Sequence, residues 1–304
     1  MTKIIDGKEF AQKIRNQVKE DSDNLFKNKE VQPCLAVVLV GENPASKVYV
    51  GAKTKMAAEC NIKTKDFKME DTTDQATLLK VIDELNNDSS VHGILVQLPL
   101  PKQIDERAVI DAIDVKKDVD GFHAINAGRL SIGGEMLKQA FIPCTPLGSL
   151  LLLKDTIPNL SGLNAVVIGR SNIVGKPMSQ LLIEESCTVT IVHSRTKDIE
   201  ALCSKADIIV AAVGRPEMIK SNWIKDDAVI IDVGINRIPS TKPDGSEGTK
   251  LVGDVDYNDV FEKSSAITPV PGGVGPMTIA CLLRNTVTSA YRYAGLDDPR
   301  GTVG

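Results

Sequence analysis

Short apolar runs alternate with segments of helical periodicity along most of the chain. Continuous apolar or β-branched runs are typical of strands that are buried on both faces of a parallel sheet. The runs that predict strands lie at residues 34–40, 62–69, 93–97, 164–168, 188–192, 207–213, 228–233 and 266–268. The segments that predict helices lie at residues 7–27, 45–60, 73–86, 105–112, 147–153, 177–185 and 277–293. This alternation predicts an α/β fold with parallel sheets and helices on both faces.

The length of the chain and two prolines indicate two domains. At 304 residues, two domains are the usual expectation. Pro143 and Pro146 mark the boundary between them. We expect residues 1–144, together with about 277–304, to form one α/β domain. Residues 145–276 should form a second domain that binds a dinucleotide, with a cleft between the two domains.

The second domain begins with a strand and a glycine turn. The apolar run ends at Gly169, and Gly175 precedes a helical segment. Such a turn directs backbone N–H groups and the positive end of a helix dipole at one point, which suits a phosphate. The spacing is Gly-x-Ser-x-x-x-Gly and departs from the full dinucleotide fingerprint, so an ordinary strand–helix turn is an equal alternative.

The end of the following strand indicates which dinucleotide binds. A dinucleotide-binding unit places its ribose-binding residue ~20 residues past the glycines, and an NAD site usually has an acid there. Here the chain reads His193-Ser194-Arg195-Thr196 and has no acid. A guanidinium makes forked, charge-assisted hydrogen bonds to phosphate oxygens, so we predict NADP. The alternative is that Arg195 is a solvated surface charge and Asp198 caps the next helix.

Composition restricts the partners and the compartment. The net charge of −4 gives no reason to expect nucleic acid or an anionic membrane as a partner. No apolar run approaches the ~18 residues of a membrane helix, and the N-terminus is too polar for a signal peptide. The six scattered cysteines fit reduced thiols in a cytoplasmic protein. The three histidines lack metal-binding spacing, so we predict no metal.

Four polar residues in the first domain are candidates for chemistry. Tyr49 and Lys53 lie four residues apart on one face of a predicted helix and could handle protons, although a surface lysine beside a half-buried aromatic is the simpler interpretation. Gln97 follows a buried strand, where parallel sheets present ligand-binding side chains. Its partner is either Lys53 or the loop at Pro99–Pro101. Asp120 could accept two parallel hydrogen bonds from a heterocycle, or serve only as an Asp-Gly turn residue.

One further loop is rich in glycine. Residues 271–276 read Pro-Gly-Gly-Val-Gly-Pro and precede an apolar-periodic helix. Three glycines in four residues are costly in conformational entropy, and they suit a backbone that approaches a ligand or turns sharply. A plain turn before the helix is the alternative.

Taken together, these segments resemble the bifunctional methylenetetrahydrofolate dehydrogenase/cyclohydrolase family, the FolD-type enzymes. The matching stretches begin at Ser46, Gly93, Lys117, Pro143, Gly169 and Pro271 and follow one another in the family's order: SKVYVGAK, GILVQLPLP, KDVDGFH, PCTP, GRSNIVGKP and PGGVGPMT. Their joint occurrence is far more specific than any single motif, and it favours functional roles for Tyr49, Lys53, Gln97 and Asp120.

The resemblance implies two reactions at one cleft. The first oxidises 5,10-methylenetetrahydrofolate to the methenyl form with NADP, and the second hydrolyses that product to 10-formyltetrahydrofolate in one-carbon metabolism. By family analogy, Lys53 is the main catalytic group, Gln97 hydrogen-bonds it, Tyr49 stacks on the folate, and Asp120 anchors the pteridine. The resemblance also implies a homodimer formed through the NADP-binding domain.

The expected binding residues form two sets. The folate set comprises Tyr49, Gln97, Leu98, Pro99, Asp120, Pro271, Gly272, Gly273 and Gly275. The NADP set comprises Gly169, Arg170, Ser171, Ile173, Val174, Gly175, His193, Ser194, Arg195, Ala212, Val213, Gly214 and Ile235.

Three other functions remain open at the level of sequence. Tyr-x-x-x-Lys is also the signature of short-chain dehydrogenases, but there it follows the nucleotide turn, whereas here it precedes it. A non-catalytic NADP sensor would need no Tyr49, Lys53 and Gln97 together. A monofunctional dehydrogenase of the same family is compatible with the same residues.

Overall fold

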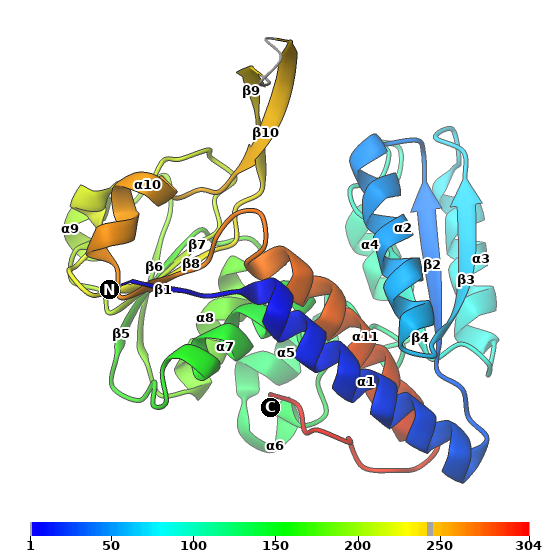
Figure 1. The fold of residues 1–304 in the computed structure, drawn as a ribbon. Coiled ribbons are helices and arrows are strands. Elements are labelled where there is room, and N and C mark those ends of the chain that lie inside the picture. Colours follow the sequence, from blue (N-terminus) through cyan, green and yellow to red (C-terminus); the bar gives the residue numbers. More distant parts are fainter. Residues whose placement is uncertain (1, 242–245, 304) are drawn as a thin grey trace. The chain divides into compact units, whose positions relative to one another are not determined.

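The computed structural model describes residues 2–241 and 246–303, apart from the side chains of residues 44, 45, 47 and 48. The chain divides into two compact units. The six-stranded unit comprises Met1–Ala11 and Thr145–Thr278, and the three-stranded unit comprises Gln12–Cys144 and Ile279–Gly304. Figure 1 shows the elements of each unit in sequence colours.

The three-stranded unit is a parallel sheet with the strand order β3-β2-β4. Its strands are β2 (Cys34–Val40), β3 (Lys63–Met69) and β4 (Gly93–Val96). Its helices are α2 (Pro44–Glu59), α3 (Gln75–Asn87), α4 (Glu106–Ala112), α5 (Ala124–Ile132) and α6 (Gly134–Leu137). Alternate residues of β2, such as Ala36 and Val38, pack with Leu78 and Ile82 of α3 and with Val109 of α4. Helix α2 covers the other face of this sheet (Figure 1).

The unit boundary falls within three helices, α1 (Gly7–Lys29), α7 (Cys144–Thr156) and α11 (Val274–Tyr293). Asp6 caps α1, because its Oδ1 accepts hydrogen bonds from the backbone N–H groups of Lys8 (2.9 Å) and Glu9 (3.0 Å). The later part of α11 is fixed in the three-stranded unit by buried side chains. Asn285 donates to Val119 O (2.8 Å), and Ser289 donates to the backbone oxygen of His92.

The six-stranded unit is a fully parallel sheet in the order β1-β11-β8-β7-β5-β6. Its strands are β1 (Lys3–Ile4), β5 (Asn164–Ile168), β6 (Thr188–Val192), β7 (Ile208–Ala211), β8 (Val229–Asp232) and β11 (Ala266–Ile267). Its shorter helices are α8 (Gly175–Glu184), α9 (Ile199–Cys203) and α10 (Tyr257–Val260), with 3-10 turns at Ser221–Trp223 and Phe261–Lys263. The chain leaves β5 to form β6 on one side and then β7 on the other. This reversal is the topological switch point at which open parallel sheets bind ligands, beyond the carboxyl ends of the strands.

Two segments differ from the sequence expectations. Residues 239–248 were expected to be a turn-rich excursion, yet residues 239–241 and 247–248 belong to an antiparallel hairpin of β9 (Asn236–Thr241) and β10 (Glu247–Val252). The predicted turn at residues 242–245 lies outside the described residues. Residues 1–11 fall in the six-stranded unit, not with residues 12–144 as expected, because β1 pairs with β11. Helices α5 and α6 were not predicted.

Candidate functional site

The side chain of Lys53 is turned inward from α2 in the three-stranded unit. The residue is only 8% exposed, and its Nζ donates a hydrogen bond to Gln97 Oε1 at 3.0 Å. An amine buried to this extent needs a polar partner, because desolvation without one is costly. The contact predicted between Lys53 and Gln97 is therefore present.

Gln97 sits where β4 ends. Its backbone N–H still donates to Val38 O (2.9 Å), so it extends the ladder, and its side chain emerges at the carboxyl edge of the sheet. The Nε2 atom donates to Leu98 O at 2.7 Å. The hydrogen bond predicted between Gln97 and Lys53 thus occurs, and the other end of the amide bonds the backbone of Leu98, directly before the Pro99–Pro101 loop that was the alternative partner. Together they fix which atom of Gln97 faces Lys53.

Asp120 lies in the turn that follows Asp118, within electrostatic reach of the Lys53 charge. Burial raises the pKa of the Asp120 carboxyl, while the positive charge of Lys53 and a hydrogen bond with the Cys144 thiol act in the opposite direction. Gly121 lets the chain turn here, since its φ is 76° and a Cβ would lie 2.6 Å from the carbonyl carbon of Ile142. The structure therefore groups an amine, an amide and a carboxyl within one unit.

Asp118 holds this turn in place, a role that the sequence did not reveal. Its carboxylate accepts hydrogen bonds from Phe122 N (3.2 Å), His123 N (2.8 Å) and Asn126 Nδ2 (2.8 Å). Burial raises the pKa of Asp118 to about 7, although these three donors favour the ionised form. The only sequence signal was an acid two residues before Asp120.

Three predicted folate residues are more accessible. Tyr49 is 39% exposed and lies one helical turn before Lys53 on α2. Partial burial raises the pKa of its hydroxyl, so the ring carries a neutral phenol at neutral pH. Leu98 is half-buried and Pro99 is exposed, and the peptide bond between them is cis. An exposed aromatic face beside a polar group is suited to stacking on a flat heterocycle.

In the six-stranded unit, the predicted glycine turn joins β5 to α8. Gly169 has a φ of 122°, and a Cβ there would lie 2.2 Å from Ala212 O. A Cβ at Gly175 would lie 2.3 Å from Gly169 O, so only glycine fits at either position. Ser171 Oγ accepts hydrogen bonds from Val174 N (3.1 Å) and Gly175 N (3.3 Å). The exposed side chains of the turn are Arg170, Ser171, Asn172 and Ile173.

The segment after β6 forms a tight turn. Thr196 N donates to His193 O (2.8 Å), His193 N donates to Thr196 Oγ1 (3.0 Å), and Arg195 N donates to His193 Nδ1 (3.2 Å). These bonds leave the side chains of Ser194 and Arg195 exposed at the carboxyl end of the strand. Asp198 has a left-handed backbone and makes no side-chain cap to α9, so the capping alternative does not hold.

The remaining residues of the predicted NADP set lie beyond β7 and β8. Ala212 and Val213 are half-buried, Gly214 has a φ of 66°, and Ile235 is 48% exposed. The backbone N–H groups of Val213 and Gly214 donate to the buried carboxylate of Asp254. The sequence reasoning did not identify Asp254, because nothing in its local pattern reveals partners that are distant along the chain.

The second glycine-rich loop precedes α11, which starts at Val274 and not at the expected Met277. Gly273 N donates to Pro269 O (2.8 Å), and Gly272 has a φ of 110°. A Cβ placed on Gly275 would meet Ile235 Cδ1 at 3.7 Å, so this loop adjoins one of the predicted NADP residues. The loop thus turns sharply into the helix, and its contact with Ile235 is at ordinary van der Waals distance.

Comparison with known proteins agrees with this geometry. Two family models match the chain: the tetrahydrofolate dehydrogenase/cyclohydrolase catalytic domain over residues 5–120, and the NAD(P)-binding domain of the same family over residues 143–294. The bifunctional protein FolD 2 of Roseobacter denitrificans is 57% identical over 299 residues and covers 98% of each chain. The chain belongs to the tetrahydrofolate dehydrogenase/cyclohydrolase family. The resemblance inferred from the motifs is confirmed.

Solved structures of the family share this fold. The FolD dehydrogenase/cyclohydrolase of Campylobacter jejuni has 46% identity and a TM-score of 0.89, and the match covers 96% of this chain and 99% of that one. The Trypanosoma brucei FolD enzyme, complexed with NADP cofactor and an inhibitor, has 34% identity and a TM-score of 0.87 over 96% of this chain and 98% of that one. The predicted nucleotide turn lies inside the part matched by the NAD(P)-binding domain.

Two further observations concern metal sites and membrane-spanning helices. Among the described residues, no group of three or more His, Cys, Asp or Glu side chains is arranged to hold a metal ion. Within the same residues, none of the helices combines the length and apolar character needed to cross a bilayer.

Proposed function

We propose that this member of the family oxidises 5,10-methylenetetrahydrofolate to 5,10-methenyltetrahydrofolate with NADP and hydrolyses the product to 10-formyltetrahydrofolate. The observation that carries this proposal is the hydrogen bond between buried Lys53 and Gln97. The two proposed reactions serve one-carbon metabolism, and their product supplies the formyl transfers of purine biosynthesis.

In the hydrolytic step, Lys53 acts on water. The oxygen of a water molecule attacks the methenyl carbon, and the Lys53 amine takes the proton. The added hydroxyl then loses its proton as the C=O bond forms and the bond from that carbon to N5 breaks. N5 takes up one proton, so that one of the two protons of water ends on N5 and the other is released, and the formyl group stays on N10. Gln97 orients the amine through its Oε1 atom.

In the oxidative step, bound NADP would supply the acceptor for the hydride that leaves the methylene carbon. The residues of the three-stranded unit position the substrate for this transfer and supply no electrons. Tyr49 stacks on the folate ring, and Asp120 accepts hydrogen bonds from the N–H edge of the pteridine. Leu98 and Pro99 complete this folate set, to which we also assign the loop residues Pro271, Gly272, Gly273 and Gly275.

The six-stranded unit fits NADP through its backbone. The glycine turn exposes the N-terminus of α8 beyond the carboxyl end of β5, where a diphosphate is favoured by N–H groups and by the helix dipole. We assign the 2′-phosphate to Ser194 and Arg195, which are exposed after β6. The other proposed NADP contacts are Gly169, Arg170, Ser171, Ile173, Val174, Gly175, His193, Ala212, Val213, Gly214 and Ile235.

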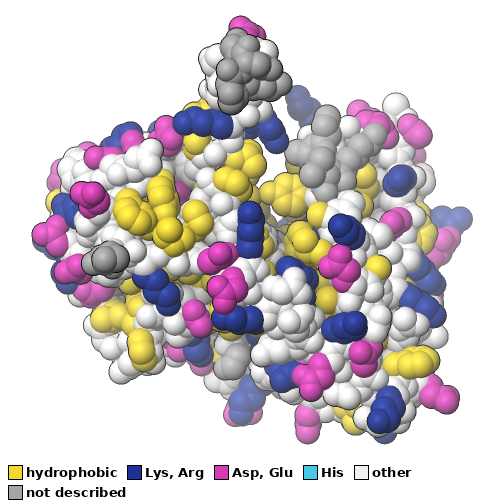
Figure 2. Space-filling view, viewed as in Figure 1, with side chains coloured by type: hydrophobic (Ala, Val, Ile, Leu, Met, Phe, Trp, Pro, Cys, Tyr) yellow, Lys and Arg dark blue, Asp and Glu magenta, His cyan; other side chains and the backbone are white. Residues whose placement is uncertain are grey.

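We also propose a homodimer formed through the NADP-binding domain in the cytoplasm. Strand β6 lies at the edge of its sheet, and Ile191 on it and Ile183 on α8 are 41% and 53% exposed. A second copy could cover these side chains. Figure 2 shows positive and negative side chains interspersed over the viewed face, which does not favour nucleic acid or an anionic membrane as a partner. Light scattering after size exclusion tests the dimer.

One continuous spectrophotometric assay tests the proposed function. The purified protein is mixed with 5,10-methylenetetrahydrofolate and NADP, and the absorbances of NADPH and of the methenyl form are followed together. We expect NADPH to accumulate in this mixture. When the methenyl form is then added to the protein, we expect it to decay faster than in buffer alone. NADPH formation without faster decay would indicate a monofunctional dehydrogenase, and NADP binding without either change would indicate a sensor.

A further inference from the structure

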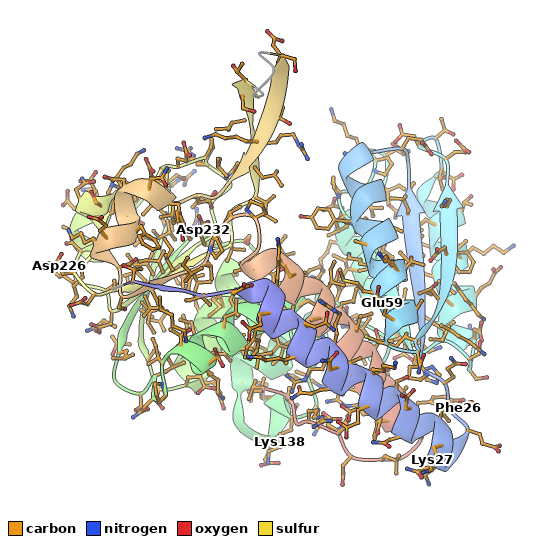
Figure 3. All side chains as sticks on the ribbon, in the orientation of Figure 1. Phe26, Lys27, Glu59, Lys138, Asp226 and Asp232 are labelled. Carbon is orange, nitrogen blue, oxygen red and sulfur yellow. The ribbon has the colours of Figure 1, made fainter. Side chains whose placement is uncertain are left out.

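Two buried carboxylates lie behind the loops that carry part of the proposed NADP site. Asp254 is 0% exposed and Asp232 is 3% exposed, and both belong to the six-stranded unit. Asp232 ends β8 and is labelled in Figure 3. An ionised carboxylate is buried at this depth only when several hydrogen bonds compensate for its lost hydration.

Asp254 collects donors from two loops at the carboxyl edge of the sheet. Its oxygens accept hydrogen bonds from three consecutive backbone N–H groups, those of Val213 (2.6 Å), Gly214 (3.0 Å) and Arg215 (2.9 Å). They also accept one from Asn236 Nδ2 at 2.8 Å. The loop after β7 and the loop after β8 are thus tied to one carboxylate.

Asp232 in turn holds Asp254. Its carboxylate accepts hydrogen bonds from the backbone N–H groups of Gly234 (2.9 Å), Asp254 (3.0 Å) and Val255 (3.0 Å). Burial raises the pKa of Asp232 to about 7, and the three donors oppose this by favouring the ionised form. The two acids therefore form one connected network.

Glycines make this network geometrically feasible. A Cβ on Gly234 would lie 2.3 Å from Asp254 Oδ1, and a Cβ on Gly253 would lie 1.7 Å from Asp232 Oδ2. No other residue type allows the backbone to approach these carboxylates so closely. The sequence thus supplies both the acids and the space that they need.

The loops held in this way include residues assigned above to NADP. Val213 and Gly214 donate directly to Asp254, and Ile235 lies between Gly234 and Asn236, which donate to the two acids. A cofactor site formed by loop backbone keeps its shape only if that backbone is fixed before binding, because ordering a loop on binding costs affinity.

We propose that Asp254, supported by Asp232, is a positioning residue that preorganises the loops after β7 and β8 for NADP. It acts through the backbone of residues 213–215 and through Asn236, and it does not touch the reacting atoms. This inference rests on the proposed assignment of these loops to NADP. It adds two acids to the site that neither a glycine motif nor a strand pattern indicates.

The decisive variant is Asp254→Asn. An amide keeps one acceptor oxygen but turns an NH₂ group toward backbone N–H donors, so at least one loop contact is lost. We expect the dissociation constant for NADP, measured by calorimetry on the full chain, to rise by about tenfold. Asp232→Asn should raise it less, because Asp232 acts through Asp254.

The matched control is Asp256→Asn, two residues further along. Asp256 pairs with Lys220 at the surface and caps α10. Its substitution therefore changes the same chemical group without affecting either loop. NADP affinity should be unchanged in this variant. Equal affinity in Asp254→Asn and Asp256→Asn, even with a lower melting temperature for the former, would show that Asp254 is only structural and would overturn the proposal.

Two further measurements keep the test decisive. If Asp254→Asn does not fold, Asn236→Ala removes one donor and leaves the three backbone donors in place. A rise of about threefold in the NADP dissociation constant supports the proposal, and no rise contradicts it. Because binding is measured without turnover, a wild-type protein that binds NADP but hydrolyses no methenyl substrate would contradict only the proposed reaction.

Discussion

The candidate sites of the two units are built from different parts of the polypeptide, side chains in one and backbone in the other. Each has a parallel sheet whose carboxyl edge carries the candidate site. In the three-stranded unit the chemistry resides in side chains, namely Lys53, Gln97 and Asp120. In the six-stranded unit the fit resides mainly in backbone, at the glycines 169 and 175 and at the loops held by Asp254.

This difference predicts how each site fails. A side-chain site loses its chemistry when one functional group is removed, even though the fold is kept. A backbone site tolerates many side-chain changes but not an added Cβ at a close approach. NADP binding and methenyltetrahydrofolate hydrolysis should therefore respond to separate sets of substitutions, and the following predictions test that separation.

The largest effect is expected for Lys53→Met, which keeps the length of the side chain but removes the proton acceptor. Hydrolysis of methenyltetrahydrofolate should fall about 10³-fold, the usual contribution of a positioned acid–base group. The control is Lys55→Met on the same helix, since Lys55 is exposed and should be replaceable. Initial rates of methenyl decay provide the measurement, and near-normal hydrolysis in Lys53→Met would remove Lys53 from the mechanism.

Gly169→Ala should damage the other site. Its φ of 122° and the 2.2 Å approach to Ala212 O leave no room for a methyl group. The loop must shift, and we expect the NADP dissociation constant to rise about a hundredfold. Gly128→Ala is the control, because a Cβ there meets nothing within 4 Å. Similar NADP affinities for both variants, measured by calorimetry, would show that the turn does not shape the site.

The free energy of unfolding should depend on pH through a buried histidine of the three-stranded unit. His92 accepts a hydrogen bond from Cys34 N (3.2 Å), and burial, with the nearby charge of Lys117, lowers its pKa to about 4 from 6.5. Neutral His92 thus contributes stability that is complete above pH 6.5 and is lost as the pH falls toward 4. Between neutral pH and about pH 5 this loss amounts to about 2 kcal/mol.

The variant His92→Gln isolates this contribution, since glutamine keeps an acceptor for Cys34 N but does not titrate. Asp118 acts with the opposite sign, because its pKa is raised to about 7 and its contribution is lost as the pH rises. The difference between wild type and His92→Gln cancels that effect. Urea denaturation at several pH values measures it, and equal acid sensitivity in the two proteins would assign the loss to other groups.

The smallest effect is expected for a substitution that lowers the selectivity for NADP over NAD. Arg195→Gln removes a guanidinium from the proposed 2′-phosphate site and should weaken NADP binding about tenfold while leaving NAD binding unchanged. Lys197→Gln, also exposed and close along the chain, is the control for a general loss of positive charge. If NADP affinity falls equally in both variants, Arg195 contributes only to the general positive charge of the surface and makes no specific contact with the 2′-phosphate.

Much of the fold follows from the sequence because buried parallel strands are continuous apolar runs. The run at residues 34–40 predicted β2 with its observed bounds, and the need of a polar side chain at the end of an apolar strand for a partner suggested the Lys53–Gln97 contact. Strand β1 was missed because two exposed residues carry no periodic signal. Strands β9 and β10 were missed because proline and glycine there resemble a loop.

The acids behind the nucleotide loops illustrate a deeper limit. Asp254 is 41 residues from Val213 along the chain, and its partners are backbone N–H groups that are the same in every residue type except proline. No local pattern can therefore indicate that contact. By contrast, Lys53 and Gln97 carry distinctive side chains, and the topology of three neighbouring strands is enough to bring them together.

A crossed comparison of Lys53→Met and Gly169→Ala tests the separation most directly. Each variant is assayed for NADP binding and for methenyltetrahydrofolate hydrolysis in the absence of NADP. Lys53→Met should bind NADP normally and lose hydrolysis, whereas Gly169→Ala should hydrolyse normally and lose NADP binding. If either folded variant lost both properties to the same extent, the division between a side-chain site and a backbone site would be contradicted.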